Sequence, residues 1–271
     1  MSPRKEPHFF GFEDRPPDKQ GPNDYVNSAI TNITDYKQLF TGVTTETAVG
    51  EASPTYLQLP RAVERIYYHI PNAKLIVILR QPADRAFSAY MHVVRDQRET
   101  APTFQEGLRR EPERIAANWG SLWHYTKAGY YYPQLKRYYD RFDSQQIRVY
   151  LHDDFVANPL AIMNDIFDFL EVDTAFVPDM QHKANVSGVQ KSKLRYFVTN
   201  TLFNKPNPIR YISRHLLPEE TRWRFTTDVR NRNLTKRHIP PDIRIKLTAE
   251  FRPDILQLEQ LINRDLSHWL V

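Results

Sequence analysis

The sequence contains no cysteine, which excludes disulfides, thiolate metal sites and cysteine nucleophiles. Glycine is also scarce, at 8 of 271 residues. The phosphate-binding patterns Gly-x-Gly-x-x-Gly and Gly-x4-Gly-Lys-Ser/Thr are both missing. The nine histidines show no HExxH or similar spacing, so we predict no metal site. These absences exclude several common kinds of active site.

Long apolar stretches are also missing from the chain. No run of 18 apolar residues occurs, and we therefore expect no transmembrane helix. The first residues, Met1–Pro7, carry charges and have no apolar run behind them, unlike a signal peptide. Together these features predict a soluble, cytoplasmic protein.

The composition is that of a globular protein, with 41% hydrophobic, 13% aromatic and 25% charged residues. The length fits one α/β domain, and we predict a single domain over residues 1–271. A net charge of +5 suits an anionic ligand but is too small to indicate nucleic acid. Residues 222–246 hold eight lysines and arginines against two acids. This basic segment suits either a solvated surface or a rim for an anionic acceptor.

Apolar runs alternate with helical patterns along the chain. The β-branched run at 74–79 is typical of a strand buried on both faces of a parallel sheet. Further strands are expected at 49–57 and 147–151. Helices are expected at 61–69, 84–96, 103–117, 131–142 and from Asn158, and Asp84 is the expected N-cap of its helix. The alternation predicts an α/β fold with a mostly parallel central sheet flanked by helices, and a helical part from about residue 192.

Arg80 and Ser88 are candidates for a phosphate site. Arg80 follows the expected strand at 74–79, at the sheet edge where open α/β sheets bind ligands. Ser88 lies near the first turns of the next helix. A guanidinium, a hydroxyl and a helix amino terminus can together hold a phosphate. The alternative is a solvated arginine without a ligand.

Glu51 is a candidate base, since a carboxylate at a strand end above a sheet is placed to accept a proton. A helix-capping or salt-bridged glutamate is the alternative. The segment His182–Arg195 mixes cations and small polar groups. This composition suits either a loop that closes over an anionic ligand or an ordinary solvated loop. Aromatic residues between Trp119 and Tyr132 suit either a sugar or lipid cleft or a buried aromatic core.

Several short motifs follow one another along residues 1–195. They are Lys5–Phe10, Gly50–Leu57, Leu79–Pro82 with Arg85 and Ser88, Gly129–Tyr131, Gln134–Leu135, Asn158–Pro159, Phe169–Leu170 and Asn185–Lys193. In this order and spacing they resemble the sulfotransferases that use 3'-phosphoadenosine 5'-phosphosulfate (PAPS). The branch that they resemble is the bacterial sulfotransferase domains similar to heparan sulfate sulfotransferases.

The resemblance implies a role for each matching residue. Arg80 and Ser88 match the site of the nucleotide 3'-phosphate, and Glu51 matches the carboxylate that takes a proton from the acceptor. The loop that covers the nucleotide is matched by Lys191, Ser192, Lys193 and Arg195. The implied partners are PAPS and a hydroxyl or amine of a carbohydrate, lipid or small-molecule acceptor, without metal or nucleic acid.

One expected part of the family pattern has no match. In the family, a strand and a Lys-x-Gly-Thr-Thr/Ser loop precede the motif that begins here at Lys5. That loop binds the 5'-phosphosulfate and supplies a catalytic lysine. We therefore predict a P-loop-like fold whose first strand and phosphate loop are missing. A sulfotransferase then competes with a truncated, non-catalytic nucleotide-binding module as the interpretation of this chain.

Overall fold

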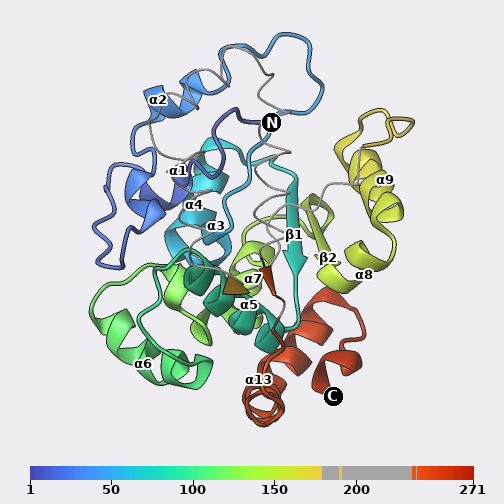
Figure 1. Ribbon diagram of the computed structural model, residues 1–271. Helices are drawn as coiled ribbons and strands as arrows, with labels where there is room; N and C mark the ends of the chain where they lie inside the picture. The colour runs from blue at the N-terminus through green and yellow to red at the C-terminus, as the bar shows by residue number, and fades with distance from the viewer. Residues whose placement is uncertain (179–188, 191–233, 236) are drawn as a thin grey trace. The chain divides into compact units, whose positions relative to one another are not determined.

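The computed structural model of the chain describes residues 1–178, 189–190, 234–235 and 237–271 (Figure 1). The chain divides into two compact units. The first consists of Met1–Tyr90, Thr100–Val177 and Pro240–Val271, and the second of Met91–Glu99 and Pro178–Ile239. The described part of the second unit includes a short antiparallel pair, β3 (Val189–Gln190) and β4 (Leu234–Thr235). The single domain stays a prediction. The helical part predicted from about residue 192 lies outside the described residues up to residue 233.

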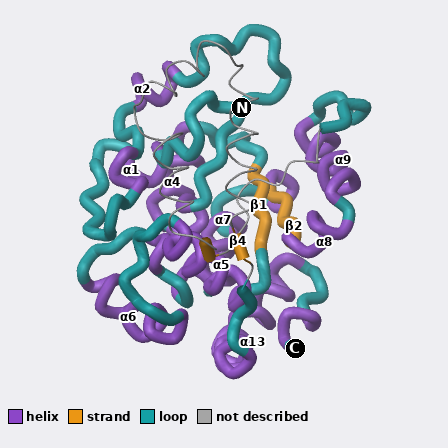
Figure 2. Tube along the Cα trace, in the orientation of Figure 1, coloured by secondary structure: helices purple, strands orange, loops and turns teal. Residues whose placement is uncertain are grey.

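Two parallel strands form the sheet of the first unit (Figure 2). β1 (Leu75–Leu79) and β2 (Ile147–Leu151) pair in register, with Leu75 opposite Ile147 and Leu79 opposite Leu151. Both strands are rich in β-branched and other apolar residues, which favour extended backbone. The predicted α/β fold, with parallel strands among helices, is confirmed.

β1 is not buried on both faces, and this part of the prediction is wrong. Leu79 is buried, but Ile76 and Ile78, which point to the opposite face, are 38% and 49% exposed. Side chains alternate between the two faces of a strand, so an apolar run does not show that both faces are covered. In the described residues only β2 pairs with β1. The missing first strand and phosphate loop stay a prediction.

Helices make up most of the rest of the first unit. They are α1 (Phe9–Phe12), α2 (Ile33–Gln38), α3 (Thr55–Gln58), α4 (Pro60–His69), α6 (Phe104–Ala116), α7 (Tyr131–Tyr139), α8 (His152–Ala157), α9 (Pro159–Leu170) and α13 (Pro241–Ile262). Five short 3-10 helices accompany them at Tyr25–Ser28, Ser121–Trp123, Lys127–Gly129, Ser144–Gln146 and Ser267–Leu270. α5 (Pro82–Arg95) begins in this unit and ends in the second. The predicted helices are confirmed, with ends shifted by a few residues.

The start of α5 differs from the prediction. The helix begins at Pro82, and the side chain of Gln81 caps it: Oε1 accepts the Asp84 N–H at 2.8 Å. Asp84 is therefore not the N-cap. It lies in the first turn of α5, where its carboxylate pairs with Arg244 of α13. The proline ring suits the first helical position because it sets the backbone angle and needs no hydrogen-bond acceptor.

The predicted strand at 49–57 is wrong. The chain before Thr55 is irregular, and α3 begins at that residue. Pro54 explains the difference, because it has no N–H to donate to a neighbouring strand but is tolerated where a helix begins. Glu51 consequently lies in a loop and not at the end of a strand.

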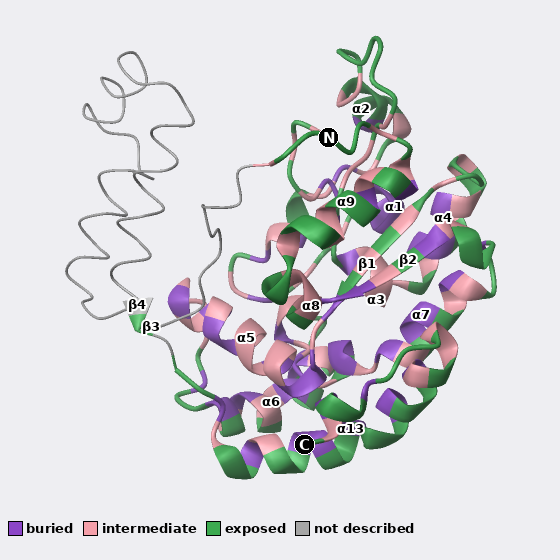
Figure 3. Cartoon of the chain, turned by 90° about the vertical axis from the view of Figure 1, so that its right-hand side faces the viewer, coloured by how far each residue is buried: buried purple, intermediate pink, exposed green. Residues whose placement is uncertain are grey.

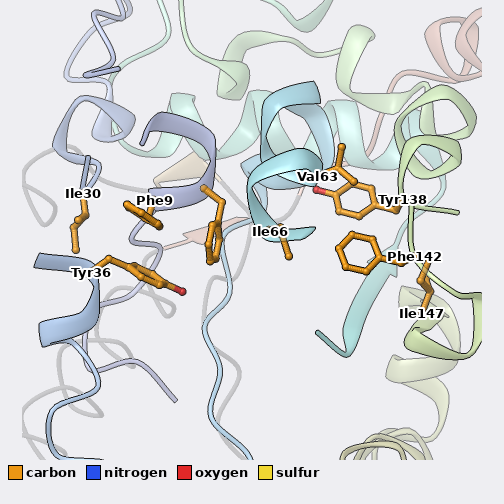
Figure 4. Packing of buried hydrophobic residues seen from close by; sticks show 9 residues of the cluster. Phe9, Ile30, Tyr36, Val63, Ile66, Tyr138, Phe142 and Ile147 are labelled. Carbon is orange, nitrogen blue, oxygen red and sulfur yellow. The ribbon is translucent and has the colours of Figure 1, made fainter. Parts of the chain in front are cut away.

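An aromatic and aliphatic cluster forms a core of the first unit (Figure 4). Its buried members are Phe9, Phe10, Ile30, Tyr36, Val63, Ile66, Tyr138, Phe142 and Ile147. Phe9 stacks on Tyr36 with ring centroids 4.4 Å apart. α4 and α7 each turn one side inward, with the three- and four-residue spacing of an amphipathic helix (Figure 3). Burial of each large apolar side chain stabilises the fold by about 1.5–3 kcal/mol. The cluster thereby holds α1 against α2.

Candidate functional site

Glu51 lies partly buried in the loop before α3. Its Oε2 accepts a hydrogen bond from Ser53 Oγ at 2.9 Å, and its Oε1 accepts one from the Tyr56 hydroxyl at 2.5 Å. Burial raises the pKa of Glu51, and the two hydrogen bonds oppose this shift because they stabilise the charged form. The nearby carboxylate of Glu6 raises the pKa further. Glu51 therefore binds a proton more tightly than an ordinary glutamate does.

The amino-terminal segment lies directly against this loop. The backbone N–H of His8 donates to Ser53 Oγ at 3.1 Å, and His8 Nδ1 lies 2.8 Å from Thr55 Oγ1. The backbone N–H of Phe10 donates to the Tyr56 hydroxyl at 3.3 Å. Two motifs that are more than 40 residues apart in the sequence therefore form one hydrogen-bonded cluster.

Glu6 and His8 are candidate functional residues that we did not single out from the sequence. Both have left-handed backbone, with φ of 52° and 56°, a conformation that costs about 1–3 kcal/mol for a residue other than glycine. The Glu6 carboxylate lies 3.8 Å from His8 Nε2. Burial lowers the pKa of His8 to about 4, so its ring is neutral at pH 7. The sequence feature that could have identified them is the pair of titratable side chains on either side of Pro7, immediately before two phenylalanines.

Arg80 lies directly after β1, at the predicted edge of the sheet. Its carbonyl oxygen accepts a hydrogen bond from the Tyr131 hydroxyl at 2.9 Å. Its guanidinium is partly exposed and makes no hydrogen bond or ion pair with the part of the chain that the structure describes. Ser88 lies on α5, about 9 Å along the helix axis from Pro82. This corner of the sheet thus presents an arginine whose charge is available to an anionic ligand.

Arg85 belongs to the same motif but has a structural role. Its guanidinium donates to the carbonyl oxygen of His124 at 3.1 Å and to that of Tyr125 at 2.5 Å. These bonds tie α5 to the aromatic segment at 119–132. Trp123 and Tyr125 are fully buried, which supports the aromatic core over the sugar or lipid cleft for this segment.

α7 links the Arg80 corner to α3, which directly follows the Glu51 loop. The hydroxyl of Tyr131, at the start of α7, donates to the Arg80 carbonyl, and the hydroxyl of Tyr138 donates to the Tyr56 carbonyl at 2.8 Å. Residues seven apart share one face of a helix and are separated by about 10.5 Å along its axis. The two halves of the candidate site are therefore held at opposite ends of one short helix.

Asp254 of α13 anchors the start of α7. Its buried carboxylate accepts the N–H of Tyr131 at 2.8 Å and that of Tyr132 at 3.2 Å. We expect Asp254→Ala to lower the free energy of unfolding by about 1–3 kcal/mol, because two buried N–H groups lose their acceptor. Urea denaturation measures this change. Glu113→Ala, an exposed substitution on α6, is the control and should change stability by less than about 0.5 kcal/mol. Equal losses in both variants would contradict the anchoring role.

Four residues of the predicted site lie outside the described residues, as does most of the basic segment at 222–246. They are Lys191, Ser192, Lys193 and Arg195. Their contact with a nucleotide stays a prediction. In the described ranges, no group of three or more histidine, aspartate and glutamate side chains is arranged to hold a metal ion.

A sequence model of the sulfotransferase family matches residues 6–176, which is more than half of the chain. The chain belongs to the sulfotransferase family. The chain is similar to the crystal structure of a sulfotransferase from Alicyclobacillus acidocaldarius. The TM-score is 0.74 and the sequence identity 37%, with 99% of this chain and 87% of the other covered. The resemblance that rested on short motifs is thereby confirmed. Among the described helices, none is long and apolar enough to cross a membrane.

Three relatives extend the comparison. The chain is 31% identical over 137 residues to the bifunctional heparan sulfate N-deacetylase/N-sulfotransferase 1 of Xenopus laevis, covering 49% of this chain and 15% of that protein. It is 27% identical over 124 residues to the human heparan sulfate glucosamine 3-O-sulfotransferase 5, covering 45% and 35%. With the membrane-associated sulfotransferase kil1 of Dictyostelium discoideum, it is 32% identical over 68 residues, covering 25% and 14%. The matched stretches span about a third or less of the length of these relatives.

Proposed function

We propose that this chain is a sulfotransferase that moves a sulfuryl group from PAPS to a hydroxyl or amine of a carbohydrate, lipid or small-molecule acceptor. The observation that carries the proposal is the arrangement around α7. One end of this helix holds the backbone of Arg80, and the other holds the backbone of Tyr56 in α3, which follows the Glu51 loop and whose hydroxyl donates to Glu51. A cation for a nucleotide phosphate and a carboxylate for an acceptor proton are thus positioned by the same element. Membership of the sulfotransferase family supports the reaction class.

In the proposed reaction, the acceptor oxygen or nitrogen attacks the sulfur of PAPS. The bond between sulfur and the 5'-phosphate oxygen breaks, and the acceptor proton passes to Glu51. The products are the sulfated acceptor and adenosine 3',5'-bisphosphate. The raised pKa of Glu51 suits this task, because a base works best when its pKa approaches the operating pH.

Nucleotide binding is proposed for Arg80 and Ser88, whose guanidinium and hydroxyl would hold the 3'-phosphate. The loop that we propose to cover the nucleotide contains Lys191, Ser192, Lys193 and Arg195. Polysaccharides are the first acceptors to test, because two of the relatives are named for heparan sulfate. An anionic acceptor would be attracted by the basic segment at 222–246.

A nucleotide-binding module without transferase activity is the second candidate. The observation that favours it is that both oxygens of Glu51 already accept hydrogen bonds from nearby side chains, Ser53 of the same loop and Tyr56 of α3. Such bonding is typical of a carboxylate that stabilises structure. This module would bind adenosine 3',5'-bisphosphate through Arg80 and transfer nothing.

The test uses PAPS that carries radiolabelled sulfur. The full chain is incubated with the donor and, in turn, with desulfated heparan polysaccharide, a glycolipid and a phenol, and the label on each acceptor is measured. Transfer to an acceptor supports the sulfotransferase. Binding of adenosine 3',5'-bisphosphate in calorimetry, without transfer to any of the three, supports the module. Absence of both binding and transfer would reject both candidates.

A further inference from the structure

The guanidinium of Arg80 makes no hydrogen bond or ion pair within the described residues, so its position depends on the backbone that carries it. An arginine side chain has several rotatable bonds, and ordering it on a ligand lowers its entropy. A fixed backbone limits where the guanidinium can reach and so reduces the cost of binding an anion. The contacts that fix the turn at residues 80–82 therefore matter for any anion site at this corner.

Gln81, the residue after Arg80, connects this turn to two other elements through one side-chain amide. It is buried, with 5% of its surface exposed. Its Oε1 accepts the Asp84 N–H at 2.8 Å, which caps α5, and its Nε2 donates to the carbonyl oxygen of Trp269 at 3.2 Å. Trp269 lies 188 residues further along the chain, in the 3-10 helix Ser267–Leu270, near the carboxyl end of β1 (Figure 1). One amide thus joins the end of β1, the start of α5 and this 3-10 helix.

The backbone of the turn is also held by buried aromatic residues. The Tyr131 hydroxyl donates to the Arg80 carbonyl at 2.9 Å, and the rings of Tyr131 and Trp269 lie 6.3 Å apart. Gly129 approaches Pro82 so closely that a Cβ at this glycine would lie 3.3 Å from the Pro82 Cβ. The turn is therefore packed on its buried side, while the Arg80 side chain stays partly exposed.

We propose that Gln81 is a positioning residue of the nucleotide site, whose amide fixes Arg80 and the start of α5 for binding of the 3'-phosphate. This inference rests on the proposed function, in which Arg80 and Ser88 hold that phosphate. Arg80 directly precedes Gln81, and Ser88 lies on the helix that Gln81 caps. A single side chain thereby sets the place of both groups. Because its amide bonds to protein on both sides, Gln81 acts through Arg80.

A neutral amide of this length suits the position better than the alternatives. A carboxylate can accept the N–H that caps α5, but it has no proton to donate to the Trp269 carbonyl. Its negative charge next to Arg80 would also oppose the binding of a phosphate. Asparagine is a common helix cap, but its side chain is one methylene shorter and should reach only one of the two partners.

The test measures the affinity of the full chain for two nucleotides by titration calorimetry. Adenosine 3',5'-bisphosphate carries the 3'-phosphate, and adenosine 5'-monophosphate lacks it. Gln81→Met keeps the length of the side chain and removes both hydrogen bonds. It should weaken binding of the bisphosphate by about three- to ten-fold and leave binding of the monophosphate unchanged. An equal loss for both nucleotides would overturn the proposal, because a general structural loss does not distinguish the 3'-phosphate.

A double-mutant cycle tests whether Gln81 acts through Arg80. In a chain that already carries Arg80→Ala, Gln81→Met should change the affinity for the bisphosphate little further, because the two residues serve one contact. The effect of Gln81→Met alone should not exceed that of Arg80→Ala. A full additional loss in the Arg80→Ala background would overturn the positioning role.

Gln146→Met is the matched control. The Oε1 of Gln146 accepts the capping N–H of Asp143 at 3.2 Å, and its Nε2 donates to the carbonyl oxygens of Pro71 and Ala73 at 3.0 and 3.1 Å. This glutamine directly precedes β2, at the amino edge of the same two strands, whereas ligands bind at the carboxyl edge. The variant should lower the thermal stability and keep the affinity for both nucleotides. A loss of bisphosphate affinity as large as that in Gln81→Met would count against a specific role of Gln81.

Gln81→Asn decides the question if circular dichroism shows that Gln81→Met is unfolded. Asparagine should keep the cap of α5 and lose the contact with Trp269, so the affinity for the bisphosphate should fall by about two- to five-fold. Wild-type affinity in this folded variant would overturn the proposal.

The positioning role and the proposed function can fail separately. If Arg80→Ala weakens bisphosphate binding and the folded Gln81 variants do not, the phosphate site stands and the positioning role fails. If Arg80→Ala binds as tightly as the wild type, both fail. Affinities that follow the cycle in a chain that transfers no labelled sulfur would support the positioning role in a binding module and reject the sulfotransferase.

Discussion

Glu51→Gln is expected to lower the turnover of sulfuryl transfer by about 10²–10⁴-fold, which is the usual contribution of a positioned general base. Glutamine is nearly isosteric with glutamate and can still accept a hydrogen bond from Ser53 or Tyr56, so the loop should keep its structure. Binding of adenosine 3',5'-bisphosphate should survive, because Glu51 is assigned to the acceptor. Initial rates with radiolabelled PAPS measure the turnover, and calorimetry measures the binding.

Glu46→Gln provides the control for this prediction. Glu46 is an exposed residue of the same loop, and its carboxylate accepts hydrogen bonds from the backbone N–H groups of Thr44 and Thr45. This variant should turn over at the wild-type rate. Normal turnover of Glu51→Gln would show that Glu51 is structural. If Glu6→Gln abolished transfer while Glu51→Gln retained it, the proton would be assigned to Glu6.

Arg80→Ala is expected to weaken the binding of adenosine 3',5'-bisphosphate by about ten-fold or more. A charge-assisted contact to phosphate contributes about 1.5–3 kcal/mol, and 1.4 kcal/mol corresponds to a factor of ten. The guanidinium has no partner to lose within the described residues, and alanine keeps the carbonyl that the Tyr131 hydroxyl contacts. The fold should therefore be retained. Titration calorimetry measures the affinity, and thermal unfolding checks the fold.

Arg109→Ala separates a specific phosphate contact from general attraction by positive charge. Arg109 is an exposed arginine of α6 that pairs with Glu106 at 2.7 Å. Its loss removes the same charge as Arg80→Ala and should leave the nucleotide affinity unchanged. An affinity that falls equally in both variants, or that does not fall in folded Arg80→Ala, would remove Arg80 from the nucleotide site.

Secondary structure was predictable where a run of apolar residues or a helix-capping residue marks the element in the local sequence. The strand at 147–151 matches β2, and Asn158 caps α9 as its position before a proline suggests. The prediction failed at 49–57, where apolar and β-branched residues resemble a strand but Pro54 blocks pairing. The prediction that both faces of β1 are buried also failed. Whether a face of a strand is covered depends on helices and strands that are distant in the sequence.

The sequence by itself determined the family, the parallel strand pair and the place of Arg80 at the end of β1. These features follow from short motifs and from the rule that ligands bind at the carboxyl edge of an open α/β sheet. Glu51 was also identifiable from its motif as a candidate residue. Its setting in a loop, however, differs from the expected strand end.

Only the tertiary structure decided how Glu51 is held and how it is linked to Arg80. The two residues that bond to Glu51, Ser53 and Tyr56, accept hydrogen bonds from the backbone of His8 and Phe10, which lie more than 40 residues away in the sequence. Hydrogen bonds of this kind depend on distances of about 3 Å and on donor angles, which no local pattern encodes. They form because α1 packs beside α3 and α4, and α3 in turn packs beside α7. The sequence therefore determined which groups are available, and packing decided which of them meet.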